Sequence, residues 1–320
     1  MGLAVAGCGA SSHARTVKSR DSRSTPAPAA STTPSTPAVA RPGPSRRIEI
    51  LPAAGRHGLF DWVPAALVGG QPAVWLSRVP AYRDPPYTVT LMRLDQQLLT
   101  LHLHAGATEP GGSGWRYGAA IGKSEQRSVV AAFNSAFRES YGAGGFEAYS
   151  RVGWALGRGK ASVVIYRDGT ADIGRWHQGI PTPGRPVAAV RQNLGLLIDA
   201  GQIAASVDRC IKKCWGDPLH ERPIVARSGL GVTADGQLVW AAGHNLSVRA
   251  LAEALAAKGV VRAMELDINP AWVAGYLYPH HSPAGADLPI PLVPGQMAIS
   301  GPYLHPYFRD FFTVVARGAA

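Results

Sequence analysis

Residues Arg227 to Trp272, RSGLGVTADGQLVWAAGHNLSVRALAEALAAKGVVRAMELDINPAW, form the most clearly patterned stretch of the chain. Two apolar runs flank Asp235-Gly236, a dipeptide typical of tight hairpin turns. Ser247 then precedes a segment whose apolar residues recur at helical spacing, and Gly259 follows that segment. Residues 260–267 are again apolar and extended in character. The stretch therefore predicts strand, turn, strand, capped helix and strand.

Two further hairpins are predicted upstream of this stretch. Asp168-Gly169 separates the apolar runs 161–166 and 171–176. A second polar turn, 95–97, separates the strand-like runs 87–94 and 98–104.

Buried strands are predicted where apolar runs have no polar alternation. These runs are 128–133, 187–198 and the closing segment 308–315, although a helix that begins near Ser124 is the alternative for the first. Hairpins thus outnumber helices along the chain. We therefore expect an α+β fold, a mostly antiparallel sheet built from hairpins with a few packed helices.

The composition divides the chain into two regions. Residues 1–47 carry seven Lys or Arg and one Asp and no aromatic residue, and residues 9–47 contain six Pro among many Ser, Thr and Ala. Such a segment cannot bury enough apolar surface to offset the entropy of ordering it. We expect residues 1–47 to be a truncated lipoprotein-type signal with a disordered linker, and residues 48–320 to form one domain.

Charge and hydropathy exclude two classes of protein. The net charge is +11, but the tail contributes more than half of it, so the folded region is only mildly basic. No basic helix or aromatic-basic pattern indicates nucleic-acid binding. No apolar run reaches the roughly 18 residues that span a bilayer. Membrane association is expected through a lipid anchor at most, and the sequence leaves the oligomeric state open.

Cys8 lies in Val5-Ala6-Gly7-Cys8, which is similar to the cleavage and lipidation motif of bacterial lipoproteins. Only seven residues precede Cys8, fewer than a complete signal peptide contains. A chance Ala- and Gly-rich terminus is the alternative. We expect lipidation at Cys8 and an exported protein that is anchored to the cell membrane or extracellular.

Cys210 and Cys214 are separated by only three residues. In an exported protein such a pair predicts a local disulfide. Free thiols and a metal site are the alternatives, but no second ligand pair follows at zinc-finger spacing.

Three polar residues, Glu265, Asp267 and Asn269, alternate along the predicted strand 260–267 and the loop after it. On a strand this spacing places them on one face. A glycosidase needs one protonated carboxylic acid and one ionised carboxylate, and two such groups side by side provide both. The alternatives are structural ion pairs with arginine, and a divalent cation near Glu265 and Asp267; no cofactor is otherwise predicted.

Other candidates lie at the ends of neighbouring predicted strands. Arg227 is a candidate for holding phosphate, because a guanidinium forms paired hydrogen bonds with phosphate oxygens. Asn134, Ser228 and His244 are candidates for binding sugar hydroxyls, and Trp272 for stacking on a sugar ring. The alternatives are a turn-capping Asn134, a loop His244, a Ser228 that is only a strand residue, and an Arg227 in a structural ion pair.

The order of these motifs resembles the phosphodiester glycosidase family. The resemblance covers residues 85–317 and rests on Asn134-Ser135-Ala136-Phe137, Gly195 to Gly201, Arg227 to Gly236, and Ala263-Met264-Glu265-Leu266-Asp267. It implies a hydrolase that acts on a glycosyl phosphodiester or a cell-envelope glycan, with Asp267, Glu265 and Arg227 in catalytic roles.

Two glycine-rich loops of that family are replaced in this chain. The family has Asn-Gly-Gly-Phe at residues 134–137 and Leu-Asp-Gly-Gly-Gly-Ser at residues 266–271, where this chain has Leu-Asp-Ile-Asn-Pro-Ala. Glycines in such loops let the backbone approach a ligand. The alternative function is therefore a non-catalytic glycan-binding or structural protein of the cell envelope with the same fold.

Overall fold

The structure is a computed structural model that describes residues 47–52, 60–82, 87–210, 212–217, 222–280, 287–297 and 302–318. The chain divides into two compact units, residues 1–41 and 42–320, and every described residue belongs to the second unit. Cys8 and nearly all of the 1–47 segment lie outside the described residues, so their lipidation and linker roles stay predictions.

The described unit is mostly β, so the expectation of an α+β fold is wrong. Strands make up 46% of it and helical residues 9%. The one long amphipathic segment, α2 (Val248–Ala256), is the only described helix of more than four residues. The apolar runs that flank the turns pair with other strands rather than with helices, so sheet packs on sheet.

The largest sheet has nine strands in the order β1-β2-β3-β4-β16-β15-β17-β13-β14. Neighbouring strands of this sheet pair antiparallel. The strands are β1 (Ile48–Ile50), β2 (Val63–Val68), β3 (Gln71–Tyr82), β4 (Tyr87–Leu94), β13 (Leu196–Asp199), β14 (Gln202–Ile203), β15 (Val225–Thr233), β16 (Leu238–Leu246) and β17 (Val260–Glu265).

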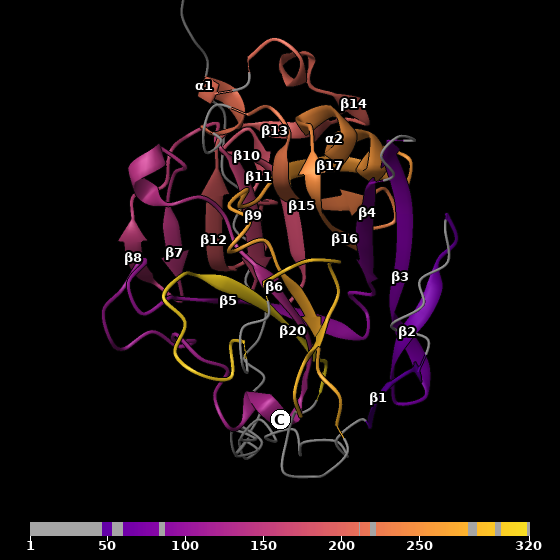
Figure 1. The fold of residues 1–320 in the computed structure, drawn as a ribbon. Coiled ribbons are helices and arrows are strands. Elements are labelled where there is room, and N and C mark those ends of the chain that lie inside the picture. Colours follow the sequence, from indigo (N-terminus) through magenta and orange to yellow (C-terminus); the bar gives the residue numbers. More distant parts are fainter. Residues whose placement is uncertain are drawn as a thin grey trace, which may run out of the picture. The chain divides into compact units, whose positions relative to one another are not determined.

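Two smaller sheets complete the described unit (Figure 1). The six-stranded sheet, in the order β11-β10-β9-β12-β7-β8, contains β7 (Phe146–Ala148), β8 (Arg151–Trp154), β9 (Ala161–Tyr166), β10 (Ala171–Trp176), β11 (Gly179–Ile180) and β12 (Val187–Asn193). The five-stranded sheet, in the order β19-β18-β6-β20-β5, contains β5 (Leu99–His104), β6 (Val129–Asn134), β18 (Gly275–Leu277), β19 (Ile290–Pro291) and β20 (Phe311–Ala316).

The nine-stranded sheet buries both of its faces, as the alternation of its side chains shows. Met92 and Trp240 belong to the main core, which also contains residues of the other two sheets. Leu91 and Val239, one position away on the same strands, belong to a second core with Leu251 of α2. Successive side chains of a strand point to opposite faces, so α2 covers the face away from the other sheets.

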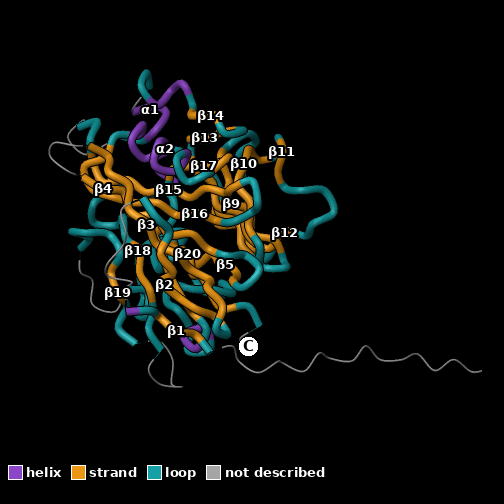
Figure 2. Tube along the Cα trace, turned by 90° about the vertical axis from the view of Figure 1, so that its right-hand side faces the viewer, coloured by secondary structure: helices purple, strands orange, loops and turns teal. Residues whose placement is uncertain are grey.

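Ser247 caps α2 as predicted. Its hydroxyl oxygen accepts a hydrogen bond from the backbone N–H of Ala250, and Gly259 follows the helix with a positive φ of 78°. The short helix α1 (Lys212–Trp215) lies at the same end of the unit as α2 in two perpendicular views (Figure 2). The remaining helical turns are the 3-10 segments η2 (Glu125–Arg127), η3 (Glu139–Tyr141) and η4 (Ala205–Val207).

Two of the three predicted hairpins are confirmed. β15 pairs with β16 around Asp235-Gly236, and β9 pairs with β10 around Asp168-Gly169. The third is wrong, because β4 pairs with β3 and β16 whereas β5 pairs with β20. The chain instead changes sheets at Asp95. Among the described residues, no helix is long and apolar enough to cross a membrane.

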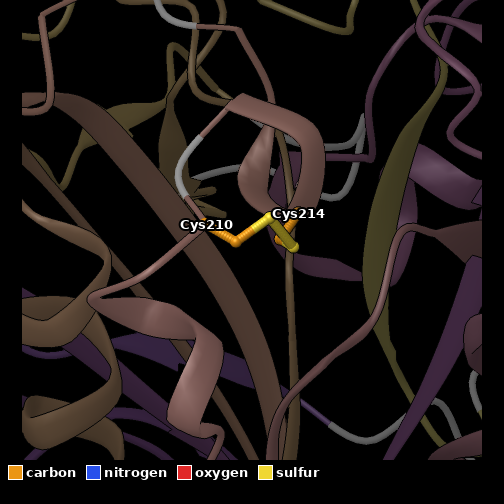
Figure 3. Close-up of a disulfide and its surroundings, with 2 residues drawn as sticks. All are labelled: Cys210 and Cys214. Carbon is orange, nitrogen blue, oxygen red and sulfur yellow. A yellow bond between two sulfur atoms is a disulfide. The ribbon is translucent and has the colours of Figure 1, made fainter.

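The structure joins Cys210 to Cys214 by a disulfide (Figure 3). This bond ties the end of the η4 segment to α1. Trp215, the last residue of α1, is 2% exposed and packs in the same core as α2. The disulfide and Trp215 together fix a short surface segment on the nine-stranded sheet.

Candidate functional site

The site lies where β6 and β17 end side by side. Leu266, directly after β17, donates its backbone N–H to the carbonyl of Ser228 at 2.8 Å. Asp267 donates its N–H to the carbonyl of Ser135, directly after β6, at 3.0 Å. The main chain of the two sheets is thus joined at Asp267. This bond fixes the backbone of Asp267 although the residue lies outside both strands.

The Asp267 carboxyl group is buried and receives a small number of hydrogen bonds. The residue is 4% exposed. Its Oδ1 accepts the backbone N–H of Asn269 at 2.8 Å, and its Oδ2 lies 3.2 Å from Nη2 of Arg309. Burial, opposed by Arg309 and by the backbone hydrogen bond, raises the pKa of Asp267 to about 6. The group therefore gains and loses its proton near neutral pH.

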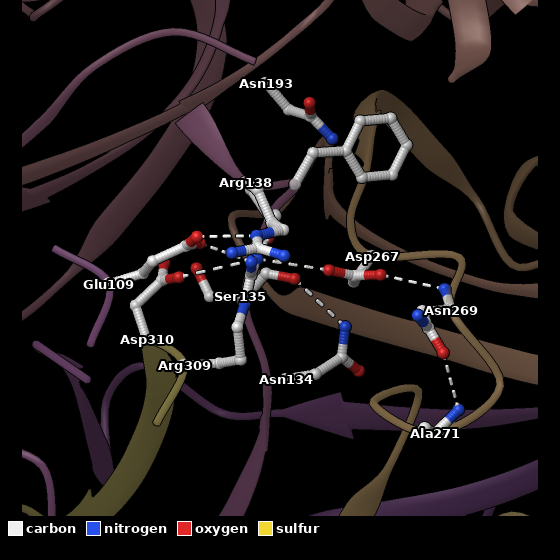
Figure 4. Close-up of polar contacts among 12 residues, drawn as sticks. Glu109, Asn134, Ser135, Arg138, Asn193, Asp267, Asn269, Ala271, Arg309 and Asp310 are labelled. Atoms are coloured by element: carbon white, nitrogen blue, oxygen red, sulfur yellow. Dashed lines mark hydrogen bonds and ion pairs between the residues drawn. The ribbon is translucent and has the colours of Figure 1, made fainter. Parts of the chain in front are cut away.

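Arg309 connects Asp267 to an alternating series of charges (Figure 4). Its Nη1 pairs with Oε2 of Glu109, and its Nη2 also donates to the carbonyl of Ala136 at 2.8 Å. Glu109 in turn accepts a hydrogen bond from Nε of Arg138 at 2.6 Å. The guanidinium carbon of Arg309 also lies 4.6 Å from the ring centre of Trp272. Each acid in this series is next to a cation, so the buried charges compensate one another.

Arg227 and Glu265 form a separate buried ion pair. Nη1 of Arg227 lies 2.6 Å from Oε1 of Glu265, and the other guanidinium nitrogens donate to the carbonyls of Leu246 and Pro223. Arg227 is fully buried and Glu265 is 2% exposed. Burial, opposed by Arg227, raises the pKa of Glu265 to about 7. The structure therefore does not support the predicted role of Arg227 in binding phosphate, because the side chain is fully buried and each of its nitrogens already donates to the chain.

Asn134 and Ser228 hold strand ends rather than face solvent. Nδ2 of Asn134 donates to Oγ of Ser228 at 2.8 Å, and that hydroxyl donates to the carbonyl of Asp267 at 2.7 Å. Asn134 is 3% exposed and Ser228 is fully buried. Their predicted contact with sugar hydroxyls is therefore not supported, and both act on Asp267 through its backbone.

A pocket of about 470 Å³ opens beside Asp267. Of the predicted site residues it brings together Asp267, His244, Asn269 and Trp272, and its lining does not include Arg227, Glu265, Asn134 or Ser228. The described lining residues are Phe137, Arg138, Tyr141, Gly216, Asp217, Arg222, Ile224, Val225, Ala226, His244, Asn245, Asp267, Ile268, Asn269, Pro270 and Trp272.

His244 and Asn269 differ in what they can offer a ligand. Nε2 of His244 is buried and has no hydrogen-bond partner among the described residues, and burial lowers the pKa of this imidazole. Burial therefore favours the neutral imidazole, and its Nε2 is an unpaired polar atom that is closed off from solvent. Oδ1 of Asn269 accepts the backbone N–H of Ala271 at 2.9 Å, so this side chain shapes the loop that replaces the glycines.

One wall of the pocket is the segment that the disulfide fixes. Gly216 directly follows α1 and has a φ of +85°, and a Cβ added there would lie 2.6 Å from the Phe137 ring. Glycine is therefore required at this position. Asp217 comes next, with a side chain that is 61% exposed, and it is the second acidic residue of the pocket lining.

Several residues of the site carry no local sequence signal. Glu109, Arg138 and Arg309 come from loops that are far apart in the chain, as Glu109 and Arg309 are 200 residues apart. The one sequence hint is the charged pair Arg309-Asp310, which directly precedes the fully buried strand β20. Asp217 lies close to Cys214, and only the fold places it in the pocket.

The sequence left open a divalent cation near Glu265 and Asp267, but in the structure each of these carboxylates contacts an arginine. Glu265 contacts Arg227, and Asp267 contacts Arg309. In the part of the chain that the structure describes, no group of three or more His, Cys, Asp or Glu side chains is arranged to hold a metal ion.

Comparisons with known proteins give similarities of fold. No protein-family model matches the chain, and no curated protein matches it by sequence. The catalytic domain of zebrafish N-acetylglucosamine-1-phosphodiester alpha-N-acetylglucosaminidase, auto-inhibited by its pro-peptide, is 13% identical with a TM-score of 0.46, over 76% of this chain and 81% of that one.

Two uncharacterised bacterial proteins give similar values. A hypothetical protein from Synechocystis is 10% identical with a TM-score of 0.42, over 85% of this chain and 68% of that one. A Burkholderia pseudomallei protein whose name describes it as exported is 11% identical with a TM-score of 0.39, over 72% and 74%. The likeness to all three is one of fold alone.

Proposed function

We propose that this chain is an exported hydrolase of the glycosidase type, which cleaves a glycosyl phosphodiester or a related cell-envelope glycan in the pocket beside Asp267. The single observation that carries the proposal is Asp267 itself. Its carboxyl group is 4% exposed, lines the pocket and has a pKa of about 6. A general acid works best when its pKa lies near the operating pH.

In this mechanism Asp267 donates its proton to the oxygen of the leaving group. Arg309, 3.2 Å away, then stabilises the carboxylate that remains. Asp217 is the second acidic residue in the pocket, and its exposed carboxylate activates the attacking water or stabilises positive charge on the sugar. This assignment replaces Glu265, which lies outside the pocket lining and is paired with Arg227.

Arg138 and Arg222 are the cations of the pocket lining, and they take over the phosphate-binding role predicted for Arg227. Nε of Arg138 pairs with Glu109, and its side chain is 42% exposed, so it can still meet an anionic group. Trp272 provides an aromatic face for the sugar, and His244 lines the same pocket. The Cys210–Cys214 disulfide supports export, because such bonds persist in oxidising compartments.

Incubation of the purified protein with a panel of glycosyl phosphodiesters and envelope polysaccharides tests the proposal. We expect Asp267→Asn to lower kcat/KM for a cleaved substrate by roughly 100-fold or more, because the amide cannot donate the proton. Glu253→Gln is the matched control, since Glu253 lies on α2 with its side chain 57% exposed and pairs with Arg249. Full activity of Asp267→Asn, or no product from any compound of the panel, would contradict the proposal.

A second candidate function is non-catalytic glycan binding. It is favoured by the pairing of both acidic residues at the end of β17 with buried arginines, Glu265 with Arg227 and Asp267 with Arg309. The same panel separates the two functions. A binding protein would retain a glycan in calorimetry, release no product, and keep its affinity in Asp267→Asn.

A further inference from the structure

We infer that the pocket beside Asp267 contains an apolar subsite and that its ligand is an amphiphile with an alkyl or prenyl chain attached to the polar head. This inference rests on the proposed function for the identity of the head group, which meets Asp267. The chain contacts a surface that we call the apolar wall, defined as Phe137, Tyr141, Ile224, Val225 and Ile268.

The apolar wall is built from three segments that meet only in the fold. Phe137 and Tyr141 follow β6, Ile224 and Val225 lie at the start of β15, and Ile268 follows β17. Phe137 and Ile268 form a small hydrophobic cluster with Ala143, and Val225 packs against it. This cluster is separate from the four larger ones. Its position in the pocket lining means that apolar surface continues from the interior to the opening.

The outer part of the apolar wall is unusually open to water. Tyr141 is 63% exposed and Ile224 is 45% exposed, and both line the same pocket. Phe308, 43% exposed, extends this surface beyond Trp272, as the two ring centres are 5.8 Å apart. Single exposed apolar residues are normal, but a group of them around one concave site marks a place where apolar surface is buried on binding.

Polar groups also line this pocket. Asp267 and Arg138 belong to the charge series with Glu109 and Arg309, and His244 has its unpaired ring nitrogen. A ligand that is polar throughout would leave the apolar wall in contact with water. A ligand with a polar head and an apolar chain satisfies both parts of the lining.

Alkyl phosphates test the subsite without requiring catalysis, because binding alone is measured. We expect calorimetry below the critical micelle concentration to show that decyl phosphate binds more tightly than methyl phosphate, by roughly fourfold for each methylene that becomes buried. Ile224→Ser lowers the ratio of the two affinities at least tenfold. Tyr141→Ser is the second variant and lowers the ratio in the same direction.

Val152→Ser is the matched control. Val152 lies on the edge strand β8, is 60% exposed and does not line the pocket. This variant should keep the full preference for decyl phosphate. Equal affinities for methyl and decyl phosphate in the wild type, or an equal loss in Val152→Ser and Ile224→Ser, would overturn the inference.

The outcomes also separate the subsite from the proposed function. A preference for decyl phosphate that depends on Ile224, without hydrolysis of any glycosyl phosphodiester, keeps the subsite and refutes the hydrolase. Hydrolysis that requires Asp267 but proceeds equally well with methyl and decyl leaving groups keeps the hydrolase and refutes the subsite.

Discussion

Asp267, just after β17, and Glu125 in η2 are two buried carboxyl groups whose pKa values are shifted in opposite directions. They are 4% and 8% exposed. Burial raises the pKa of Asp267 to about 6, whereas His104 and His102 overcome the effect of burial and hold the pKa of Glu125 well below its usual range. Removal from water alone therefore does not fix the charge of a buried carboxyl group, because its partners can outweigh burial, as they do at Glu125.

The difference lies in the number of donors around each carboxylate. Glu125 receives Nδ1 of His102 at 3.0 Å, Nε2 of His104 at 3.1 Å and the hydroxyl of Thr313. Asp267 accepts the backbone N–H of Asn269 and has one cation, Arg309 at 3.2 Å, which it shares with Glu109. A saturated carboxylate is a structural anchor, whereas an undersaturated one beside a pocket is available for proton transfer.

The largest expected effect is on the saturated group. We expect Glu125→Gln to lower the free energy of unfolding by about 3 kcal/mol at pH 7, because the hydrogen bonds to a buried charge are lost. Urea unfolding measures this difference. Because the folded pKa of Glu125 is depressed, its stabilisation is present above about pH 4.5 and is lost as the pH falls, so the gap between wild type and variant must narrow in acid.

Asp267→Asn is the counterpart in the same experiment. It should change the free energy of unfolding by less than about 1 kcal/mol at pH 7, since the amide removes a costly buried charge and Arg309 keeps Glu109. Similar losses of stability in Asp267→Asn and Glu125→Gln would show that the two groups do not differ in the way proposed.

The second prediction concerns pH and activity. A general acid must be protonated, so kcat/KM of the hydrolase should fall about tenfold for each pH unit above about 6, roughly 100-fold by pH 8. A pH–rate profile of the wild type shows this limb. Activity that is level from pH 6 to pH 8 would assign the proton to a group other than Asp267.

The third prediction concerns the covalent support of the pocket wall. The double variant Cys210→Ser, Cys214→Ser should lose about 2 kcal/mol of unfolding free energy, the chain-entropy value for so short a loop. A reducing agent should destabilise the wild type by the same amount and leave the variant unchanged. The Glu125→Gln variant keeps the Cys210–Cys214 disulfide, so the reducing agent should destabilise it as much as it destabilises the wild type.

The smallest expected effect is at the two-residue turn that joins β7 and β8. Tyr149 and Ser150, with φ of 52° and 67°, form the two-residue turn between β7 and β8 and line a second pocket together with His102. Glycine adopts this conformation more readily, so Ser150→Gly should raise the free energy of unfolding by about 0.5 kcal/mol. Thermal unfolding measures it, with destabilisation as the contrary result.

Local signals in the sequence predict the centre of the fold correctly. The Asp235-Gly236 hairpin and the Ser247-capped helix are set by residues close together in the chain, and both are confirmed. The pairing of β4 with β5 was wrong because partners in a sheet are chosen by burial, and β5 finds β20 more than 200 residues later. Packed helices are scarce for the same reason, because the apolar runs are buried by pairing with other strands.

The site was predictable only in part. Asp267, His244, Asn269 and Trp272 were identified from motifs and do line the pocket. Arg227 was assigned to a ligand because a sequence does not show which carboxylate a guanidinium will meet, and here it meets Glu265, 38 residues away. Arg309 was missed for the same reason, as its contact with Asp267 joins two loops.

The position of β20 has a consequence for the order in which the molecule is made. This strand lies between β5 and β6, and it begins two residues after Arg309, the cation that faces Asp267. During synthesis β5 and β6 must therefore wait until β20 has been made before they gain their common neighbour. The carboxyl group acquires its cation in the same event. A partly made chain thus carries an unfinished site, and completion of the last sheet coincides with completion of the pocket.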